Sequence, residues 1–166
     1  YCGGFLIFTA VASVTDVTVS EKNCLVDSSS GGGIIINNSS VSLAKISVTD
    51  NTAYWGGGMC IINTDAALIS LTVSGNTAGL GGGLFLGENG NATLTNSIIW
   101  DNIPTSIIDW GANTITFSDI QGGWEGEENI DSDPFFTDPD NGDFSLQQGS
   151  PCIDAGTADL DGDEDI

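Results

Sequence analysis

The chain of 166 residues contains no arginine and no histidine, and its only basic residues are Lys22 and Lys45. Against these two lysines stand 23 acidic residues, which give a formal net charge of −21 at pH 7. Binding to a phosphate backbone depends on clustered lysine and arginine, so this balance argues against nucleic acid as a partner. It also disfavours an anionic membrane surface, which attracts the same basic groups.

Long apolar runs are missing as well. No stretch reaches the roughly 18 consecutive apolar residues of a membrane-spanning helix, so we expect no membrane insertion. Stretches of strong helix formers are also absent, which disfavours a helical repeat.

Glycine, by contrast, is abundant and clustered. Triplets occupy residues 31–33, 56–58 and 81–83, so their spacing is 25 residues. An apolar run follows each triplet, and then a patch in which apolar residues alternate with Ser or Thr. A fixed period of this length indicates a stacked repeat, and the alternation indicates strands with one buried face. We therefore predict an all-β, right-handed parallel β-helix (β-solenoid) with about 25 residues per coil.

Aligned on this period, the apolar residues form columns with one member in each coil. The predicted inward columns are Val14, Leu43, Leu68 and Leu94; Val17, Ile46, Leu71 and Ser97; Val19, Val48, Val73 and Ile99; Phe5, Ile34, Met59 and Leu84; and Ile7, Ile36, Ile61 and Leu86. The glycines are expected to supply positive φ at turns and close approach between coils.

A further column contains the turn residues Asn23, Asn51, Asn76 and Asn102. These residues either form an internal ladder of amides, as in other stacked β-structures, or act as plain turn formers.

The composition changes after Gly123, where acidic residues concentrate. We predict that residues 1–123 form the coils, the last of them degenerate, and that residues 124–166 form an irregular acidic C-terminal module and linker. Trp100, Trp110 and Trp124 lie near this junction and are expected to cap the open end of the core.

The four cysteines are too widely spaced for a paired zinc-binding motif, and no histidine accompanies them. An even number in a secreted chain is compatible with disulfides, for which three connectivities exist. Cys2 with Cys24 would staple the first coil, and Cys60 with Cys152 would tie the C-terminal segment to the body. Alternatively, Cys60 is a buried small apolar residue.

Several motifs resemble a known group of proteins. Residues 129–136, 138–146 and 149–156, together with 100–102 and 118–123, resemble the C-terminal module of large secreted bacterial right-handed parallel β-helix proteins of the choice-of-anchor Q type. The coils are similar to the polymorphic outer-membrane protein repeat, with its Gly-Gly-apolar start. The resemblance covers nearly the whole chain. It implies an extracellular or surface-attached β-helix but no particular activity.

Parallel β-helices include polysaccharide lyases and hydrolases, so a carbohydrate-binding or polysaccharide-degrading fragment is the main alternative. A lyase normally needs a cationic group beside the uronate, and a hydrolase needs facing carboxylates. The strands after the glycine triplets carry no acid, and Gly75 separates Asp50 from Asp101 in the turn column. We therefore predict no catalytic residue in these coils and no enzyme activity.

Calcium is the expected cofactor, if there is one. Carboxylates alternate along the tail, as they do in calcium-binding loops, at Asp159, Asp161, Asp163 and Asp165. A second acidic cluster contains Asp131 and Asp133, followed by Asp138, Asp140 and Asp143. The alternative to calcium binding is that the tail is a solvated linker and that the second cluster is a set of turn residues.

Hydroxyl side chains are predicted to stack outward on a flat face at Thr18, Ser20, Ser47, Thr49, Thr72 and Ser74. Ice-binding solenoids use such arrays, which makes ice binding a minor alternative, although Ser and Thr are also ordinary solvent-facing strand residues.

Taken together, the sequence favours a non-catalytic, extracellular or cell-surface protein with a structural or adhesive role. The expected partners are copies of the chain, stacked end to end into filaments through their strand edges, or a surface polysaccharide or protein.

Overall fold

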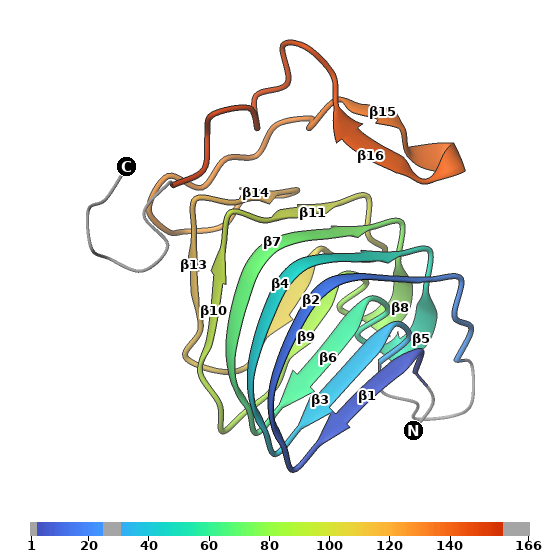
Figure 1. The fold of residues 1–166 in the computed structure, drawn as a ribbon, viewed down its shortest axis with the longest axis vertical. Helices are drawn as coiled ribbons and strands as arrows, with labels where there is room; N and C mark the ends of the chain where they lie inside the picture. Colours follow the sequence, from blue (N-terminus) through green and yellow to red (C-terminus); the bar gives the residue numbers. More distant parts are fainter. Residues whose placement is uncertain (1–2, 25–30, 158–166) are drawn as a thin grey trace.

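The computed structural model describes residues 3–24 and 31–157. They form an all-β solenoid of about four turns, in which parallel strands stack about 25 residues apart (Figure 1). The predicted parallel β-solenoid is therefore confirmed. Only one short helix, the 3-10 helix η1 (Pro139–Asn141), occurs in the described part of the chain.

The first sheet is built from the apolar runs that follow the glycine triplets. Its strands lie side by side in the order β1, β3, β6, β9 and β12, and all the pairings are parallel. The bounds are β1 (Phe5–Phe8), β3 (Ile34–Asn37), β6 (Met59–Ile62), β9 (Leu84–Leu86) and β12 (Ile107–Asp109).

The second sheet contains three long strands that each cover two sides of the solenoid. They are β2 (Val11–Ser20), β4 (Ser40–Thr49) and β7 (Asp65–Ser74). Each has one residue with positive φ in its middle, Asp16, Lys45 or Ser70, and this left-handed backbone turns the strand onto the next side.

Later coils divide this long strand in two. On one half of β7 lie β10 (Ala92–Thr95) and β13 (Thr114–Thr116), and on the other half lie β11 (Ile98–Trp100) and β14 (Asp119–Ile120). A short parallel pair, β5 (Thr52–Trp55) with β8 (Thr77–Leu80), leads from the second sheet back to the glycine triplets.

The predicted apolar columns are confirmed. Cα pairing places Val14 beside Leu43, Leu43 beside Leu68, and Leu68 beside Leu94, and the first sheet continues from Leu84 to Ile107. Leu43, Leu68 and Leu94 are almost fully buried. The core is therefore a set of aliphatic columns along the solenoid axis, stabilised by burial of apolar surface.

The asparagine column forms the predicted ladder in three coils. Asn51 Nδ2 donates to Asn76 Oδ1, and Asn76 Nδ2 donates to Asn102 Oδ1, each over 3.0 Å. Each amide also donates to a backbone carbonyl of the preceding coil, as Asn76 does to Val48 at 2.8 Å. Asn51 and Asn76 are fully buried, so the ladder satisfies polar groups inside the core.

Asn23 was assigned to this column wrongly. The first coil is longer by four residues, and its Lys22 backbone N–H donates to Asn51 Oδ1 at 2.9 Å, so Lys22 holds the ladder position. Asn23 is exposed and forms a bridge with Thr52.

The glycine triplets have the two predicted roles. Gly31, Gly56 and Gly81 have φ values of 67°, 59° and 62°, which an L side chain rarely adopts. At the second position the coils are in close backbone contact: a Cβ on Gly57 would lie 2.5 Å from the Thr77 carbonyl oxygen. Successive coils can therefore approach at this corner only without side chains.

Coil stacking continues beyond β14. Asp119 forms a parallel bridge with Ile130, and the Ile130 N–H donates to the Ser118 carbonyl at 2.9 Å. The sequence-based boundary at residues 123 and 124 falls just before this bridge. Trp124 is partly buried against the core, as expected for a residue that caps it.

Residues 132–157, the C-terminal segment, then lie across the outside of the second sheet, on the side of β11 and β14 (Figure 1). It contains an antiparallel pair, β15 (Phe136–Asp138) and β16 (Asp143–Leu146), joined by η1. Phe136 and Phe144 pack edge to face, with ring centroids 5.1 Å apart.

Candidate functional site

Four aromatic side chains, from β5, β9 and the residue after β12, gather beside the outer face of the first sheet. An open groove of about 640 Å³ is lined there by Tyr54, Trp55, Phe85 and Trp110, which we call the aromatic groove. This volume is within the range of roughly 300–1,000 Å³ that is usual for small-ligand sites. Tyr54 and Trp110 are 50% and 52% exposed, although large aromatic side chains normally bury most of their surface.

The rings of the groove hold one another in place. Phe85 is buried and forms the floor, with its centroid 5.0 Å from that of Trp55 and 4.8 Å from that of Trp110. Trp55 and Trp110 are themselves 5.5 Å apart, and all three ring pairs are close to perpendicular. Edge-to-face packing of this kind is favourable, so the groove is formed before any ligand arrives.

Polar groups line the rim of the groove. Asn89 Nδ2 donates to Asn63 Oδ1 over 3.2 Å, and Asn63 Nδ2 donates to Asn37 Oδ1 over 3.3 Å. Glu88 is exposed, and its backbone carbonyl accepts from the Asn63 N–H, which fixes the loop. The rim therefore offers amides and one carboxylate beside the ring faces.

Carboxyl groups are scarce in the lining of the groove. Glycoside hydrolysis uses two carboxyl groups that flank the bond, and the groove lining contains one, Glu88.

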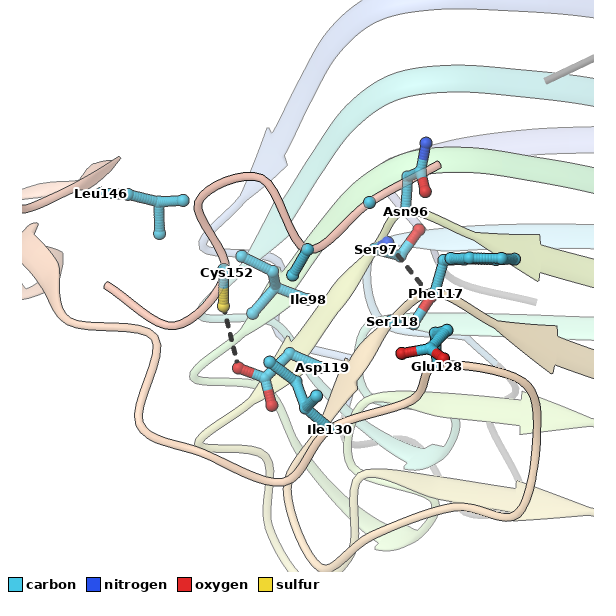
Figure 2. A pocket seen from close by; sticks show the side chains of 12 residues that line it. Asn96, Ser97, Ile98, Phe117, Ser118, Asp119, Glu128, Ile130, Leu146 and Cys152 are labelled. Atoms are coloured by element: carbon cyan, nitrogen blue, oxygen red, sulfur yellow. Dashed lines mark hydrogen bonds between the residues drawn. The ribbon is translucent and has the colours of Figure 1, made fainter. Parts of the chain in front are cut away.

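A second, smaller pocket of about 220 Å³ lies where the C-terminal segment meets the second sheet. Figure 2 shows Cys152 of that segment pointing at Asp119 of β14, with Ile98 and Ile130 beside them. The Cys152 thiol donates to Asp119 Oδ2 at 3.0 Å, and the Ser132 N–H donates to Asp119 Oδ1 at 3.2 Å. Asp119 is only 3% exposed. Its hydrogen bonds with Ser132 and Cys152 join two parts of the C-terminal segment to the solenoid.

Burial governs the protonation of this pair. It raises the pKa of Asp119, helped by the nearby carboxylates of Asp131 and Asp133 and opposed by the hydrogen bonds from Cys152 and Ser132. Burial, together with the hydrogen bond to Asp119, raises the pKa of the Cys152 thiol to about 12. A thiol with this pKa stays protonated near neutral pH, which agrees with the hydrogen bond that Cys152 donates to Asp119.

Other contacts complete the attachment of the C-terminal segment. Asn96 Nδ2 donates to the Thr157 carbonyl at 2.8 Å, and the Thr157 N–H donates to Asn96 Oδ1 at 2.9 Å. Trp100 is half-buried and lines a shallow pocket with Phe135, Phe136 and other residues of the segment.

The three tryptophans that were predicted to cap the core therefore lie in three different places. Trp124 packs against the core, Trp100 faces the C-terminal segment, and Trp110 lies in the aromatic groove. The expectation that Trp100 and Trp110 cap the core was wrong, because both lie on the outside of the solenoid.

The described acidic cluster forms turns. Asp131 Oδ1 accepts from the Gly122 N–H, Asp133 Oδ1 accepts from the Phe135 N–H, and Asp138 accepts from the Asn141 side chain. Over residues 3–24 and 31–157, no three His, Cys, Asp or Glu side chains come together as a metal-binding group. Asp159, Asp161, Asp163 and Asp165 lie outside the described residues.

The cysteine predictions have different outcomes. Cys24 is disulfide-bonded, as expected, and its predicted partner Cys2 lies outside the described residues. The predicted Cys60–Cys152 disulfide was wrong, since neither residue is in a disulfide. Cys60 is fully buried on the outer side of the first sheet, which matches the alternative of a small apolar residue, whereas Cys152 bonds to Asp119.

Both hydroxyl columns have the predicted pairing, but one of them lacks the predicted exposure. Ser20, Thr49 and Ser74 are aligned, yet Thr49 and Ser74 are only 4% exposed, on the side where the C-terminal segment lies. Burial and the Glu21 carboxylate raise the pKa of Asp50, the hydrogen bond with Thr49 opposes this shift, and Asp140 of that segment adds to it. This column is therefore not an open, flat hydroxyl face.

Comparisons of the chain with protein-family profiles, curated proteins and solved structures return no match. Within the described ranges, no helix has the length and apolar character needed to cross a membrane.

Proposed function

We propose that this chain is a non-catalytic scaffold of the bacterial cell exterior with a structural and adhesive role. The observation that carries the proposal is the repetition of the outer surface. Asn37, Asn63 and Asn89 follow one another from coil to coil and bond as a partly exposed ladder. A surface that repeats along one axis suits binding to a repeating polymer or to copies of the same chain.

The roles of the acidic residues support the non-catalytic part of the proposal. Asp65, Asp109, Asp131 and Asp133 accept hydrogen bonds from backbone or asparagine N–H groups near them, as turn and corner residues do. Asp119 accepts two hydrogen bonds in a buried joint. These carboxylates have structural partners.

The exposed strand edges of β1 and β2 support self-association of this chain. Within the described residues, β1 and β2 each pair on one side only, with β3 and β4. Val11 is 90% exposed there, and Leu6 is 47% exposed. Open strand edges with apolar side chains favour the addition of another strand layer.

One experiment separates the adhesive proposal from the enzymatic alternative. The purified chain is incubated with a panel of neutral and acidic polysaccharides, and both retention on the polymer and release of reducing or unsaturated sugar ends are measured. Retention without release is expected. Sugar ends that accumulate with time in proportion to protein concentration would overturn the proposal.

Self-association is tested by sedimentation and electron microscopy of the chain and of Val11→Lys. We expect concentration-dependent, end-to-end particles, which the lysine weakens because it places charge on the strand edge. Particles that stay monomeric at every concentration in both proteins would remove self-association from the proposal.

Calcium binding by the acidic tail is a further part of the proposal. Added Ca²⁺ should raise the melting temperature of the chain and a chelator should reverse the rise, whereas a chain truncated after Thr157 should not respond. Identical melting curves of the full chain with Ca²⁺ and with chelator would count against it.

A further inference from the structure

The aromatic groove is a preformed cavity in which large aromatic side chains remain exposed. Tyr54 enters from β5, Phe85 from β9 and Trp110 from the residue after β12, so the groove spans several coils along the solenoid axis. Two of its rings are about half exposed, and mutual packing fixes their orientation. Over residues 3–24 and 31–157, the structure leaves these two rings accessible.

The combination of ring faces and amides indicates the chemistry of the occupant. A pyranose ring with equatorial hydroxyl groups has two flat faces of C–H groups and a rim of hydroxyls. Its faces suit the rings of Trp110 and Tyr54, and its rim suits the side chains of Asn63, Asn89 and Glu88. A purely apolar partner would leave these polar groups without water or hydrogen bonds, which is unfavourable.

The charge of the groove lining favours neutral over acidic sugars as ligands. The residues that line the groove include no lysine or arginine and one carboxylate, Glu88, in a chain with a net charge of −21. A uronate or sulfated glycan would be repelled and would find no cationic partner there. A neutral glycan has no such penalty.

We propose that the aromatic groove binds a neutral polysaccharide or oligosaccharide whose pyranose rings carry equatorial hydroxyls, with Trp110 and Tyr54 as stacking residues. This inference rests on the proposed adhesive function and names its ligand class. The successive Asn63 and Asn89 amides extend the contact along the solenoid axis, so several consecutive sugar units contribute to binding.

The test is a titration of the full chain with cellohexaose and with hexagalacturonic acid, followed by calorimetry and tryptophan fluorescence. Cellohexaose should bind and hexagalacturonic acid should bind at least tenfold more weakly. Trp110→Ala should weaken cellohexaose binding at least tenfold, and Tyr54→Ala at least threefold. Ile153→Ala, which removes a 46% exposed apolar side chain from the C-terminal segment, is the matched control and should have no effect.

Glu88→Gln tests the charge argument. It should leave cellohexaose affinity within twofold and raise the affinity for hexagalacturonic acid. Circular dichroism melting of each variant ensures that a loss of binding is not a loss of fold, and Tyr54→Ala gives a second reading if Trp110→Ala is unstable.

Three outcomes would overturn the inference. The first is that cellohexaose does not bind at millimolar concentration. The second is that wild type and both groove variants bind it equally. The third is that Trp110→Ala abolishes self-association while cellohexaose leaves the self-association of wild type unchanged. Retention on another polysaccharide in the panel experiment would then still support the adhesive function, so the two proposals can fail separately.

Discussion

Two sides of the solenoid carry aromatic residues on their outer surface, and only one of these surfaces is covered by another segment of the described chain. On the second sheet, Trp100 faces Phe135 and Phe136, and the C-terminal segment covers this side. On the first sheet, Tyr54 and Trp110 stay half exposed in a groove. Since the chain has a segment that shields one aromatic surface, the exposure of the other is a property of the fold that a ligand can use.

The covered side also differs in how it is held. Its contacts are a few specific polar groups, among them Asp119 with Cys152 and Asn96 with Thr157. Both sides rest on the same internal columns and on the buried asparagine ladder. Perturbations of the ladder should therefore affect both sides, whereas perturbations of surface residues should affect one.

The largest effect is expected from Asn76→Ala. Asn76 is fully buried, donates to Val48, Ser74 and Asn102, and accepts from Asn51, so its loss leaves several buried polar groups unpaired. We expect a loss of about 3–4 kcal/mol in the free energy of unfolding, measured by denaturant titration. Asn91→Ala is the control: it removes one exposed hydrogen bond to Asp65 and should cost less than about 1 kcal/mol. Equal losses in the two variants would contradict a structural role for the ladder.

The next effect separates the two aromatic sides. Trp100→Ala should destabilise the fold by about 2 kcal/mol, because it removes a half-buried ring from the joint with the C-terminal segment. Trp110→Ala should cost about half as much, since this ring is 52% exposed. Limited proteolysis should cut the segment after residue 131 faster in Trp100→Ala only. A reversed order would mean that the groove, and not the joint, is the structural surface.

A smaller effect concerns pH. The folded-state pKa of Asp119 is raised above its ordinary value of 3.8, so its stabilising contribution is complete below that value and is lost as pH rises through the folded-state pKa. The melting temperature of Asp119→Asn relative to wild type should therefore increase as pH rises from about 4 to 7. The Ser145 hydrogen bonds lower the pKa of Asp143 from 3.8, so the melting temperature of Asp143→Asn relative to wild type should instead decrease as pH rises, and it should do so below about pH 4. Parallel profiles for both variants and wild type would contradict this assignment.

The smallest effect is a difference in reactivity that leaves stability unchanged. Cys60 is buried and the Cys152 thiol has a raised pKa, so both should react slowly with iodoacetamide in the folded chain. In denaturant without reductant, peptide mass mapping should find both residues alkylated. A linked Cys60–Cys152 peptide would show instead that the disulfide exists.

Much of the fold could be predicted because the repeat makes each position visible several times. Column members such as Leu43, Leu68 and Leu94 differ little, so one alignment gave both the strands and their pairing. The position of Asn23 was predicted wrongly because its coil is longer. In a strand, an offset of one residue exchanges the inward-facing and outward-facing positions.

The aromatic groove could not be predicted in the same way, because its residues come from different positions of different coils. Trp110 lies in a coil that lacks the glycine triplet. Tyr54 and Trp55 lie just before the triplet at residues 56–58. A signal did exist in the first sheet: Ile35, Cys60 and Phe85 are apolar at outward positions, between the inward members of the columns. Three consecutive apolar residues in a strand indicate that both of its faces are covered.

The joint with the C-terminal segment depends on contacts between residues far apart in sequence. Asp119 and Cys152 do not belong to a repeat, so nothing in the alignment relates them. The even number of cysteines therefore left a Cys60–Cys152 disulfide and a buried Cys60 thiol both open, and the structure has a thiol–carboxylate hydrogen bond at Cys152.

The central claim is that the aromatic groove is an open ligand surface while the other aromatic side is already occupied by the chain itself. Hydroxyl-radical footprinting with and without cellohexaose tests it most directly, because the oxidation of each tryptophan and tyrosine is read separately. We predict that Tyr54 and Trp110 are oxidised in the free chain and protected by cellohexaose, whereas Trp100 is weakly oxidised in both conditions. Unchanged oxidation of Tyr54 and Trp110, or ligand-dependent protection of Trp100 instead, would contradict the claim.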